Sequence, residues 1–142
     1  MLVRRAAPGE MAAIGSILTG SGLPVDDFGA DITFLAAESA GEIVGTIALE
    51  AYPPAGLLRS AAVLPVYRGL GVGALLVDAL VREARARSLS ELVLLTTTAE
   101  KFFTRMGFER IERDSLGGPV LSSGQFAGTR CSSAAVMRMG LV

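Results

Sequence analysis

The spacing of hydrophobic and polar residues along the chain predicts strands and helices in a mixed order. Apolar residues three or four positions apart predict helices, whereas short runs rich in β-branched and aromatic residues predict strands. The predicted strands cover residues 1–6, 33–38, 42–51, 57–64, 92–96, 108–113 and 131–139. The predicted helices cover residues 8–20, 71–87 and 99–106, with a loop or short helix at 23–32 and a loop at 115–129. This order predicts a single α+β domain over residues 1–142, built on a mixed sheet with few helices.

The helix at residues 71–87 has the clearest pattern of the three. Its predicted apolar stripe consists of Val72, Leu75, Leu76, Ala79 and Leu80. Its other side offers two favourable i,i+4 ion pairs, Asp78–Arg82 and Glu83–Arg87. Elsewhere, Ser39-Ala40-Gly41 is typical of a hairpin turn between two strands. Thr97 and Glu100 fit a capping box that would begin the helix at 99–106, and Gly107 would end that helix.

Composition excludes several classes of protein and of active site. Hydrophobic residues make up 51% and charged residues 19% of the chain, which is typical of a folded domain rather than a disordered one. The 13 basic and 14 acidic residues nearly balance, which disfavours a nucleic-acid binder. The chain has no histidine and one cysteine, Cys131. Ser-His and Cys-His mechanisms and histidine or cysteine metal sites are therefore excluded, and we expect no metal.

The mean hydropathy of +0.51 requires a test for membrane spans. The most apolar run, residues 69–77, is closed by Arg68 and Asp78 after nine residues, whereas a spanning helix needs about 20. Near the N-terminus, Arg4 and Arg5 precede Pro8 rather than an apolar run, so we expect no signal peptide. A cytoplasmic location is the prediction.

The segment from Val63 to Ala74 carries the strongest functional signal. A strand ends there, a glycine-rich turn follows, and a helix begins. Free amide N–H groups and the dipole at a helix N-terminus favour anions, and glycine lets a phosphate approach the backbone. Arg68 adds a positive charge suited to phosphate oxygens. The segment therefore predicts a pyrophosphate site, with a tight turn that binds no ligand as the structural alternative.

Two nucleotide-binding patterns compete for this loop. Gly69, Gly71 and Ala74 match the dinucleotide pattern G-x-G-x-x-G/A, which also needs an acidic residue at the end of the next strand. Glu91 stands before that strand instead, and the chain is too short for two nucleotide-binding halves. A P-loop is excluded because no Gly-Lys-Ser/Thr follows. A dinucleotide-binding module with affinity for NAD(H) remains an alternative.

The second pattern is R-x-x-G-x-G/A, formed by Arg68, Gly71 and Gly73. Together with Ala62-Val63-Leu64-Pro65 before it and the later Phe102–Phe108 segment, it resembles the GNAT N-acetyltransferase superfamily over the whole chain. Leu95-Thr96-Thr97-Thr98 with Phe102-Phe103 is similar to the acetyltransferase domain of N-acetylglutamate synthases. Leu58-Arg59-Ser60, the threonine run and Cys131–Ala134 are similar to arsenic-resistance-associated N-acetyltransferases, although Ser132 stands where a proline is common there.

The resemblance implies a mostly antiparallel sheet, flanked by helices, with a V-shaped opening between the central strands. It implies acetyl-CoA as co-substrate and transfer of acetyl to the amine of a small amino acid or analogue by direct attack. The implied cofactor-binding residues are Ala62, Val63, Leu64, Arg68, Gly69, Leu70, Gly71, Val72, Gly73, Ala74 and Phe103. The Val63 amide would donate to the thioester oxygen. The superfamily often forms homodimers, for which the last strand offers a contact.

Glu50 is the first candidate for the general base, because it ends the central strand beside the expected opening. Its structural alternative is a solvated strand end. Glu38, Tyr52, Asp26, Asp27 and ordered water are the other candidates. Phe103 occupies the position where many relatives carry a tyrosine that protonates the leaving thiolate. A non-catalytic acyl-CoA-binding sensor is therefore an alternative function.

Four residues are candidates for binding the substrate. Arg59 lies inside an apolar strand and could hold a substrate carboxylate, or it could pair with Glu50 or face outward. Asp26 and Asp27 lie in the loop where the superfamily often gathers substrate, with helix capping as the alternative. Thr96 stands where many relatives carry asparagine. Cys131 would bind an arsenical in the arsenic-linked interpretation, and otherwise serve as a small buried residue.

Overall fold

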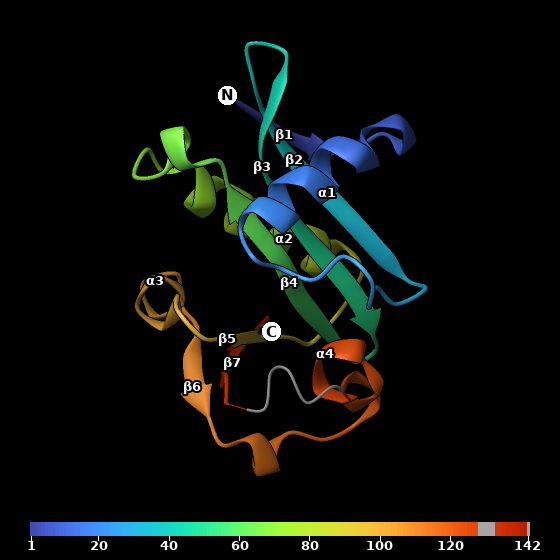
Figure 1. Cartoon of the computed structure of the whole chain (residues 1–142). Coiled ribbons are helices and arrows are strands. Elements are labelled where there is room, and N and C mark those ends of the chain that lie inside the picture. The colour runs from blue at the N-terminus through green and yellow to red at the C-terminus, as the bar shows by residue number, and fades with distance from the viewer. Residues whose placement is uncertain (128–132, 142) are drawn as a thin grey trace.

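A seven-stranded sheet organises the computed structural model, which describes residues 1–127 and 133–141 (Figure 1). The strands are β1 (Leu2–Arg5), β2 (Ile32–Ser39), β3 (Glu42–Tyr52), β4 (Ala55–Val63), β5 (Glu91–Thr96), β6 (Glu109–Ile111) and β7 (Ala135–Gly140). Their order in the sheet is β1-β2-β3-β4-β5-β7-β6. Every neighbouring pair is antiparallel except β4 and β5, which are parallel. The predicted α+β class and its mostly antiparallel sheet are therefore confirmed.

Helices cover both faces of this sheet. They are α1 (Met11–Gly20), α2 (Val72–Ala86), α3 (Glu100–Arg105) and α4 (Gly124–Ala127). Successive side chains of a strand point to opposite faces, so β3 contributes Ile47 and Leu49 to one core and Ala48 to the other. The first core also contains Leu76 and Leu80 of α2, and the second contains Ile14, Ile17 and Leu18 of α1. α1 and α2 thus each bury one apolar stripe, on opposite faces of the sheet.

Most predicted elements are present, with three differences. The first helix opens with a 3-10 turn over Pro8–Glu10 before α1 begins. The predicted loop at 115–129 contains a 3-10 turn, Pro119–Ser122, and the short α4. The last strand begins at Ala135 rather than at Cys131, which lies outside the described residues. The short helical turns were missed because they contain too few residues to show a period.

The buried face of α2 differs from the predicted stripe. Leu75 is 46% exposed, whereas Val77 and Val81 join Leu76 and Leu80 in the core. The buried face of α2 is therefore turned away from Leu75, toward Val77 and Val81. On the outer side Glu83 pairs with Arg87 at 2.9 Å. No ion pair joins Asp78 to Arg82 within the part of the chain that the structure describes.

The helix α3 is capped differently from the prediction. Its N-cap is Ala99, and the Ala99 amide donates to Oγ1 of Thr96 at 3.0 Å. The predicted capping box of Thr97 and Glu100 is therefore wrong. Thr96 is the last residue of β5, so its hydroxyl lies under the turn and reaches the amide three residues later.

A β-bulge in β4 separates the central strands. Thr46 of β3 faces Ala62, whereas Ala48 faces Arg59, so β4 carries one extra residue between these pairs. Ser60 takes up the extra length with a left-handed φ of 57°. Pairing of β4 with β5 covers only Ala55–Leu57, and the rest of β4 leaves β5 without a partner on that edge. This arrangement forms the opening that the resemblance predicted.

The last strand lies inside the sheet rather than at its edge. β7 pairs with β5 along its whole length and with β6 at residues 136–138. The outermost strand at this end is the three-residue β6. A homodimer, with the last strand as its contact, stays a prediction. None of the described helices combines the length and the apolar content that a membrane span requires.

Replacing Leu80 by alanine tests the packing of α2. Leu80 is fully buried in the core between α2 and the sheet, so Leu80→Ala should lower the free energy of unfolding by about 2–5 kcal/mol. Leu75→Ala on the exposed side of the same helix should change it by only about 0.5 kcal/mol. Urea unfolding followed by circular dichroism measures both values. Equal losses for the two variants would contradict the burial pattern of α2.

Candidate active site

The N-terminus of α2 presents free backbone amides to an open surface. Gly71 is the N-cap, with a left-handed φ of 85°, and no side chain caps this end. The helical hydrogen bonds begin with Leu75, whose amide donates to the Gly71 carbonyl at 3.1 Å. The three amides before it, at residues 72–74, have no partner within a helix. A Cβ on Gly69 or Gly71 would meet nothing within 4 Å, so the space above the loop is open to a ligand.

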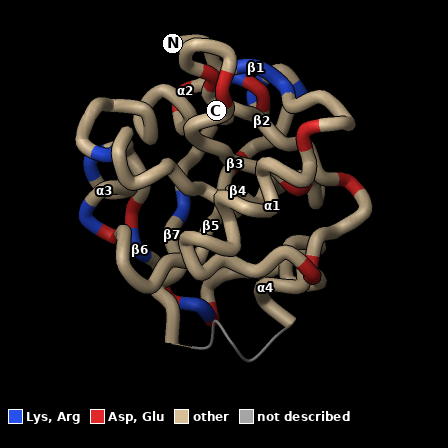
Figure 2. Tube along the Cα trace, turned by 45° about the horizontal axis from the view of Figure 1, so that its top comes forward, with Lys and Arg blue, Asp and Glu red and all other residues tan. Residues whose placement is uncertain are grey.

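A pocket of about 460 Å³ lies over this loop. Arg68 and Arg105 both line it, so two cations flank the free amides. Arg105 comes from α3, whose basic residues are visible in Figure 2. The sequence did not indicate Arg105, because residue spacing in the Phe102–Phe108 segment cannot show that the last turn of α3 lies beside the glycine loop. Of the predicted loop residues, Gly69, Gly71, Val72, Gly73 and Ala74 also line this pocket.

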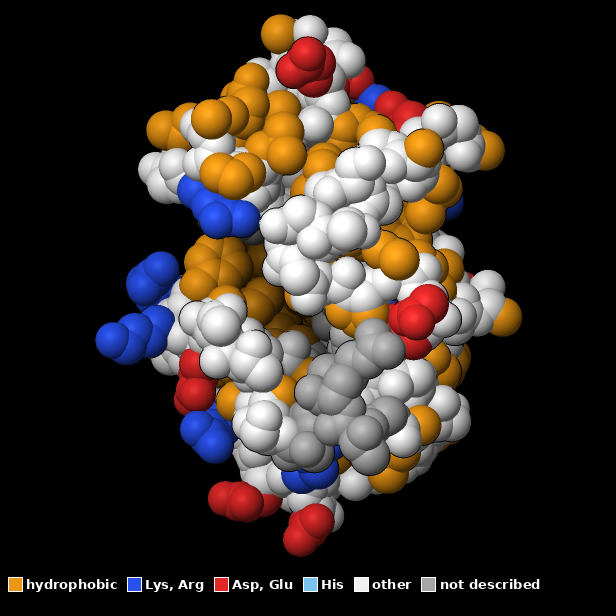
Figure 3. All heavy atoms as spheres, in the orientation of Figure 1, with side chains coloured by type: hydrophobic (Ala, Val, Ile, Leu, Met, Phe, Trp, Pro, Cys, Tyr) orange, Lys and Arg blue, Asp and Glu red, His pale blue; other side chains and the backbone are white. Residues whose placement is uncertain are grey.

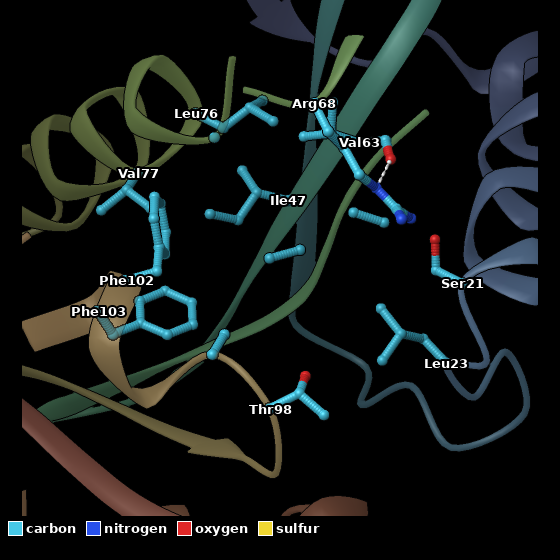
Figure 4. Close-up of a pocket in the computed structure, with 14 residues that line it drawn as sticks. Ser21, Leu23, Ile47, Val63, Arg68, Leu76, Val77, Thr98, Phe102 and Phe103 are labelled. Carbon is cyan, nitrogen blue, oxygen red and sulfur yellow. Dashed lines mark hydrogen bonds between the residues drawn. The ribbon is translucent and has the colours of Figure 1, made fainter. Parts of the chain in front are cut away.

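A second pocket, of about 500 Å³, continues from the first between β4 and α3 (Figure 4). The two pockets share Val63, Arg68, Gly73 and Phe102 as lining residues. A Cβ on Gly73 would lie 3.3 Å from Cζ of Phe102, so glycine allows this aromatic ring to approach the helix. Ile47, Leu76 and Val77 form an apolar wall. This channel suits an extended, largely apolar chain that ends in a phosphate group.

The edge of β4 along this channel carries an unpaired amide. Leu64 donates its amide to the Val44 carbonyl at 2.8 Å, toward β3. Alternate amides of a strand point to opposite edges, so the Val63 amide points away from β3 and into the opening. The Arg68 Nε donates to the Val63 carbonyl at 3.1 Å and holds this strand end against the loop. Ala62 lines the channel beside Val63.

Two of the predicted cofactor residues lie outside these pockets. Leu64 lines neither pocket, because its side chain packs against the two cores of the sheet. Leu70 is 67% exposed and lines neither pocket. Their direct contact with a cofactor is therefore not supported by the geometry.

A third pocket, of about 390 Å³, lies at the far end of the channel. Apolar residues make up much of its lining, while Ser60, Thr96, Thr97, Thr98 and Gln125 add hydroxyl and amide groups and Arg59 is its one charged lining residue. It shares five lining residues with the channel, namely Leu23, Ala61, Thr98, Ala99 and Phe103. These residues mark the junction, the place where a molecule in the channel would meet one in the third pocket. Figure 3 shows the surface hollowed on this side, with apolar side chains inside and Lys and Arg side chains near its rim.

Phe103 lies at the junction and belongs to the core as well. Its side chain is 6% exposed and packs edge to face with Phe102 at 5.1 Å and with Phe108 at 5.6 Å between ring centroids. The predicted contact of Phe103 with the channel is compatible with this position. An aromatic ring without a hydroxyl therefore stands where a proton donor was expected by resemblance.

Arg59 is among the residues that line the third pocket, and its side chain is buried in an ion-pair network. Its guanidinium donates to Glu50 Oε2 at 3.0 Å and to Oδ1 of Asp27, and its Nε donates to Ser60 Oγ at 3.3 Å. The ring of Phe28 lies 4.9 Å from the guanidinium carbon. The side chain has no exposed surface. The ion pair with Glu50, one of the two alternatives to a substrate role, is present, and a free guanidinium for a substrate carboxylate is not.

Glu50 is enclosed rather than placed at the opening. It is 1% exposed and accepts hydrogen bonds from the Gly29 amide and the Tyr52 hydroxyl, each at 2.8 Å. Burial, with the hydrogen bond to Glu50, raises the pKa of Tyr52 to about 12. Glu50 shares its strand face with Ala48, on the α1 side, and lines none of the three pockets. The geometry therefore argues against Glu50 as the base and against a solvated strand end.

The other predicted polar residues are distributed unequally. Thr96 lines the third pocket. Asp27 binds Arg59 and so ties the loop between α1 and β2 to the sheet, while Asp26 on the same loop is exposed. Neither aspartate lines the channel or the third pocket, whereas Leu23 of this loop lines both. Glu38 pairs with Arg4 at 2.7 Å and lines none of the three pockets.

Comparisons with known proteins agree with this geometry. Among curated proteins, an amino-acid acetyltransferase of Mycobacterium tuberculosis is 40% identical over 81 residues, which are 56% of this chain and 44% of that protein. An amino-acid acetyltransferase of Vibrio atlanticus is 33% identical over 85 residues, which are 58% of this chain and 19% of that protein. The chain spans about half or less of the length of the curated relatives it matches.

The fold is shared with solved structures of low sequence identity. The N-acetylglutamate synthase of Neisseria gonorrhoeae, in complex with coenzyme A and N-acetyl-glutamate, superposes with a TM-score of 0.81 at 21% identity, over 99% of this chain and 35% of that chain. A Mycobacterium tuberculosis protein in complex with CoA superposes over the full length of both chains with a TM-score of 0.80 at 24% identity. The family model of the acetyltransferase (GNAT) domain matches residues 30–110, more than half of the sequence. The chain belongs to the GNAT acetyltransferase family.

Proposed function

We propose that this protein transfers the acetyl group of acetyl-CoA to the amine of a small amino acid or amino-acid analogue by direct attack on the thioester. One observation carries the proposal: three pockets adjoin in series, from the glycine loop through the channel to the junction and the third pocket. The first has the amides and cations that a pyrophosphate needs, and the second has a largely apolar wall. The third has several hydroxyl groups, and its one charged lining residue, Arg59, is already paired with Asp27 and Glu50. This sequence of environments matches the parts of acetyl-CoA and a separate acceptor.

Backbone amide groups would make most of the proposed polar contacts with acetyl-CoA. The amides at residues 69–74 would hold the pyrophosphate, with Arg68 and Arg105 neutralising its charge. The pantetheine arm would run along Ala62 and Val63. The Val63 amide would donate to the thioester oxygen as negative charge develops there, and one such donor contributes about 3–4 kcal/mol to transition-state stabilisation.

Hydroxyl groups in the third pocket would bind the acceptor. The Thr96 Oγ1 accepts from the Ala99 amide, and Ser60 Oγ accepts from Arg59, so each hydroxyl keeps its own hydrogen to donate. A substrate carboxylate in the third pocket would take such donors in place of the occupied guanidinium of Arg59. The relatives described as amino-acid acetyltransferases support an amino acid as the acceptor class. Arg59, Asp27 and Glu50 then act as positioning residues.

The proposed mechanism needs no dedicated base for an α-amino acceptor. An α-amino group has a pKa near ~8, so an appreciable fraction is neutral at neutral pH, whereas a lysine amine near ~10.4 would need about 4 kcal/mol of help. The chain has no histidine, and Glu50 is enclosed. The proton released on attack would pass to water in the third pocket.

The alternatives have weaker support. A non-catalytic acyl-CoA sensor rests on the missing hydroxyl at Phe103, and product formation would exclude it. A dinucleotide-binding module is disfavoured, because only one strand pair of the sheet is parallel. The similarity to arsenic-resistance-associated N-acetyltransferases stays a prediction from sequence, since Cys131 lies outside the described residues.

Gly71→Glu tests the pyrophosphate site. A carboxylate at the N-terminus of α2 would repel the pyrophosphate, so calorimetry should show the affinity for acetyl-CoA falling by at least about 100-fold. Gly41→Glu is the matched control, because Gly41 also has a left-handed φ and lies in the exposed β2–β3 turn, away from the pockets. NADH should bind neither the wild type nor the variants. Undiminished affinity in Gly71→Glu would refute the loop assignment.

The pH dependence of the rate tests how the amine is deprotonated. For an α-amino acceptor, kcat/KM should rise with pH and level off above an apparent pKa of about 8, because only the neutral amine attacks. An acceptor amine of lower pKa should shift this inflection downward by the difference in amine pKa. An inflection that stays fixed when the acceptor changes would indicate an enzyme group as the base.

Glu50→Gln separates a positioning role from a catalytic one. The amide keeps the size of the side chain and leaves Arg59 paired with Asp27. We expect kcat to change by less than about 10-fold, with the pH profile preserved. A general base typically contributes about 10²–10⁴-fold. A loss in that range, with a flattened pH profile, would restore Glu50 as the base.

A further inference from the structure

The leaving thiolate needs a partner that Phe103 cannot supply. In the proposed reaction, the amine nitrogen forms a bond to the carbonyl carbon, and the carbon–sulfur bond then breaks with its electron pair going to sulfur. The amine proton passes to water. Sulfur therefore acquires negative charge at the junction, where the channel meets the third pocket. A hydrogen-bond donor at this place would stabilise that charge.

Thr98 is the one junction residue with a polar side chain among the five that the two pockets share. The other four, Leu23, Ala61, Ala99 and Phe103, offer only apolar side chains. Figure 4 shows the Thr98 hydroxyl pointing into the channel, opposite the Val63 strand end. No hydrogen-bond partner of Thr98 Oγ1 occurs among residues 1–127 and 133–141. The hydroxyl is thus free to serve a ligand.

The local fold explains why this hydroxyl faces the junction. Thr96 turns the chain after β5 by accepting the Ala99 amide, so the next three residues form a tight turn above the opening. Thr97 lines only the third pocket, whereas Thr98 lines both the third pocket and the channel. Adjacent hydroxyls therefore face different parts of the site.

We propose that Thr98 donates a hydrogen bond to the sulfur of the leaving thiolate, in place of an acidic side chain. This inference rests on the proposed acetyl transfer. Its hydroxyl keeps its proton and acts as a donor only. The Val63 amide and the Thr98 hydroxyl would then approach the thioester from opposite sides of the channel, one toward oxygen and one toward sulfur. The sequence pointed to Thr96 instead, whose hydroxyl accepts the Ala99 amide and lines the third pocket but not the channel.

The thiol pKa of bound coenzyme A tests this role without an acceptor. Thiolate absorbance in the ultraviolet reports the ionisation of the bound thiol as pH is raised. A hydrogen bond to the thiolate should lower the pKa of the bound thiol, and Thr98→Val should raise that pKa by about one to two units relative to wild type. Thr98→Ser should retain the wild-type value, because it keeps the hydroxyl. Thr97→Val is the matched control and should also retain it.

Turnover and binding complete the test. In a reaction with L-glutamate as the first acceptor tried, kcat of Thr98→Val should fall about 10–100-fold while the KM for acetyl-CoA stays within about threefold. Thr98→Ala provides a second hydroxyl-free variant, and circular dichroism checks that both fold. Coenzyme A binding with an unchanged thiol pKa in both variants would overturn the role of Thr98 alone. Failure of the wild type to bind coenzyme A would overturn the proposed function and this role together.

Discussion

The bulge at Ser60 is the constraint on which the site depends. A left-handed conformation at a serine costs of the order of 1–3 kcal/mol and persists only where the surroundings enforce it. Here β3 holds β4 on both sides of the bulge, at Ala62 and at Arg59. The extra residue turns β4 away from β5, which opens the channel and leaves the Val63 amide without a strand partner. Without the bulge, β4 and β5 could pair along their length and close the place where the thioester would lie.

Just before the bulge, a buried charge network joins the α1–β2 loop to the sheet. Arg59 holds two carboxylates, Asp27 from the α1–β2 loop and Glu50 from β3, and Glu50 in turn accepts the Gly29 amide of the same loop. Desolvation makes such pairs expensive, so their net stabilisation is small, but removing one partner leaves a buried charge uncompensated. The network therefore fixes where the loop lies more than it adds stability. Leu23 reaches the junction from this loop.

The acyl-transfer step proposed for this site relies on positioned dipoles rather than on a side-chain acid or base. The pocket linings provide amides at the start of α2, the Val63 amide and hydroxyls at Ser60 and Thr98. Acyl transfer from a thioester is suited to such a site, because the nucleophile and the leaving group are both supplied by the substrates. The protein orients them and stabilises the charge that develops. The absence of histidine from the sequence is consistent with a site in which the substrates supply the reacting groups.

The sequence by itself determined the elements and the anion loop, because both depend on neighbouring residues. Residue spacing predicts α2 and the strands, and Arg68 with Gly71 and Gly73 indicates the phosphate site within six positions. Only the tertiary structure decided the surroundings of Glu50, Arg59, Arg105 and Thr98. The bulge, the pairing of loop with sheet, and the packing of α3 beside the glycine loop set their surroundings. Burial and charge partners arise from segments distant along the chain, so local pattern could locate Glu50 and Arg59 on strands but could not show that each satisfies the other.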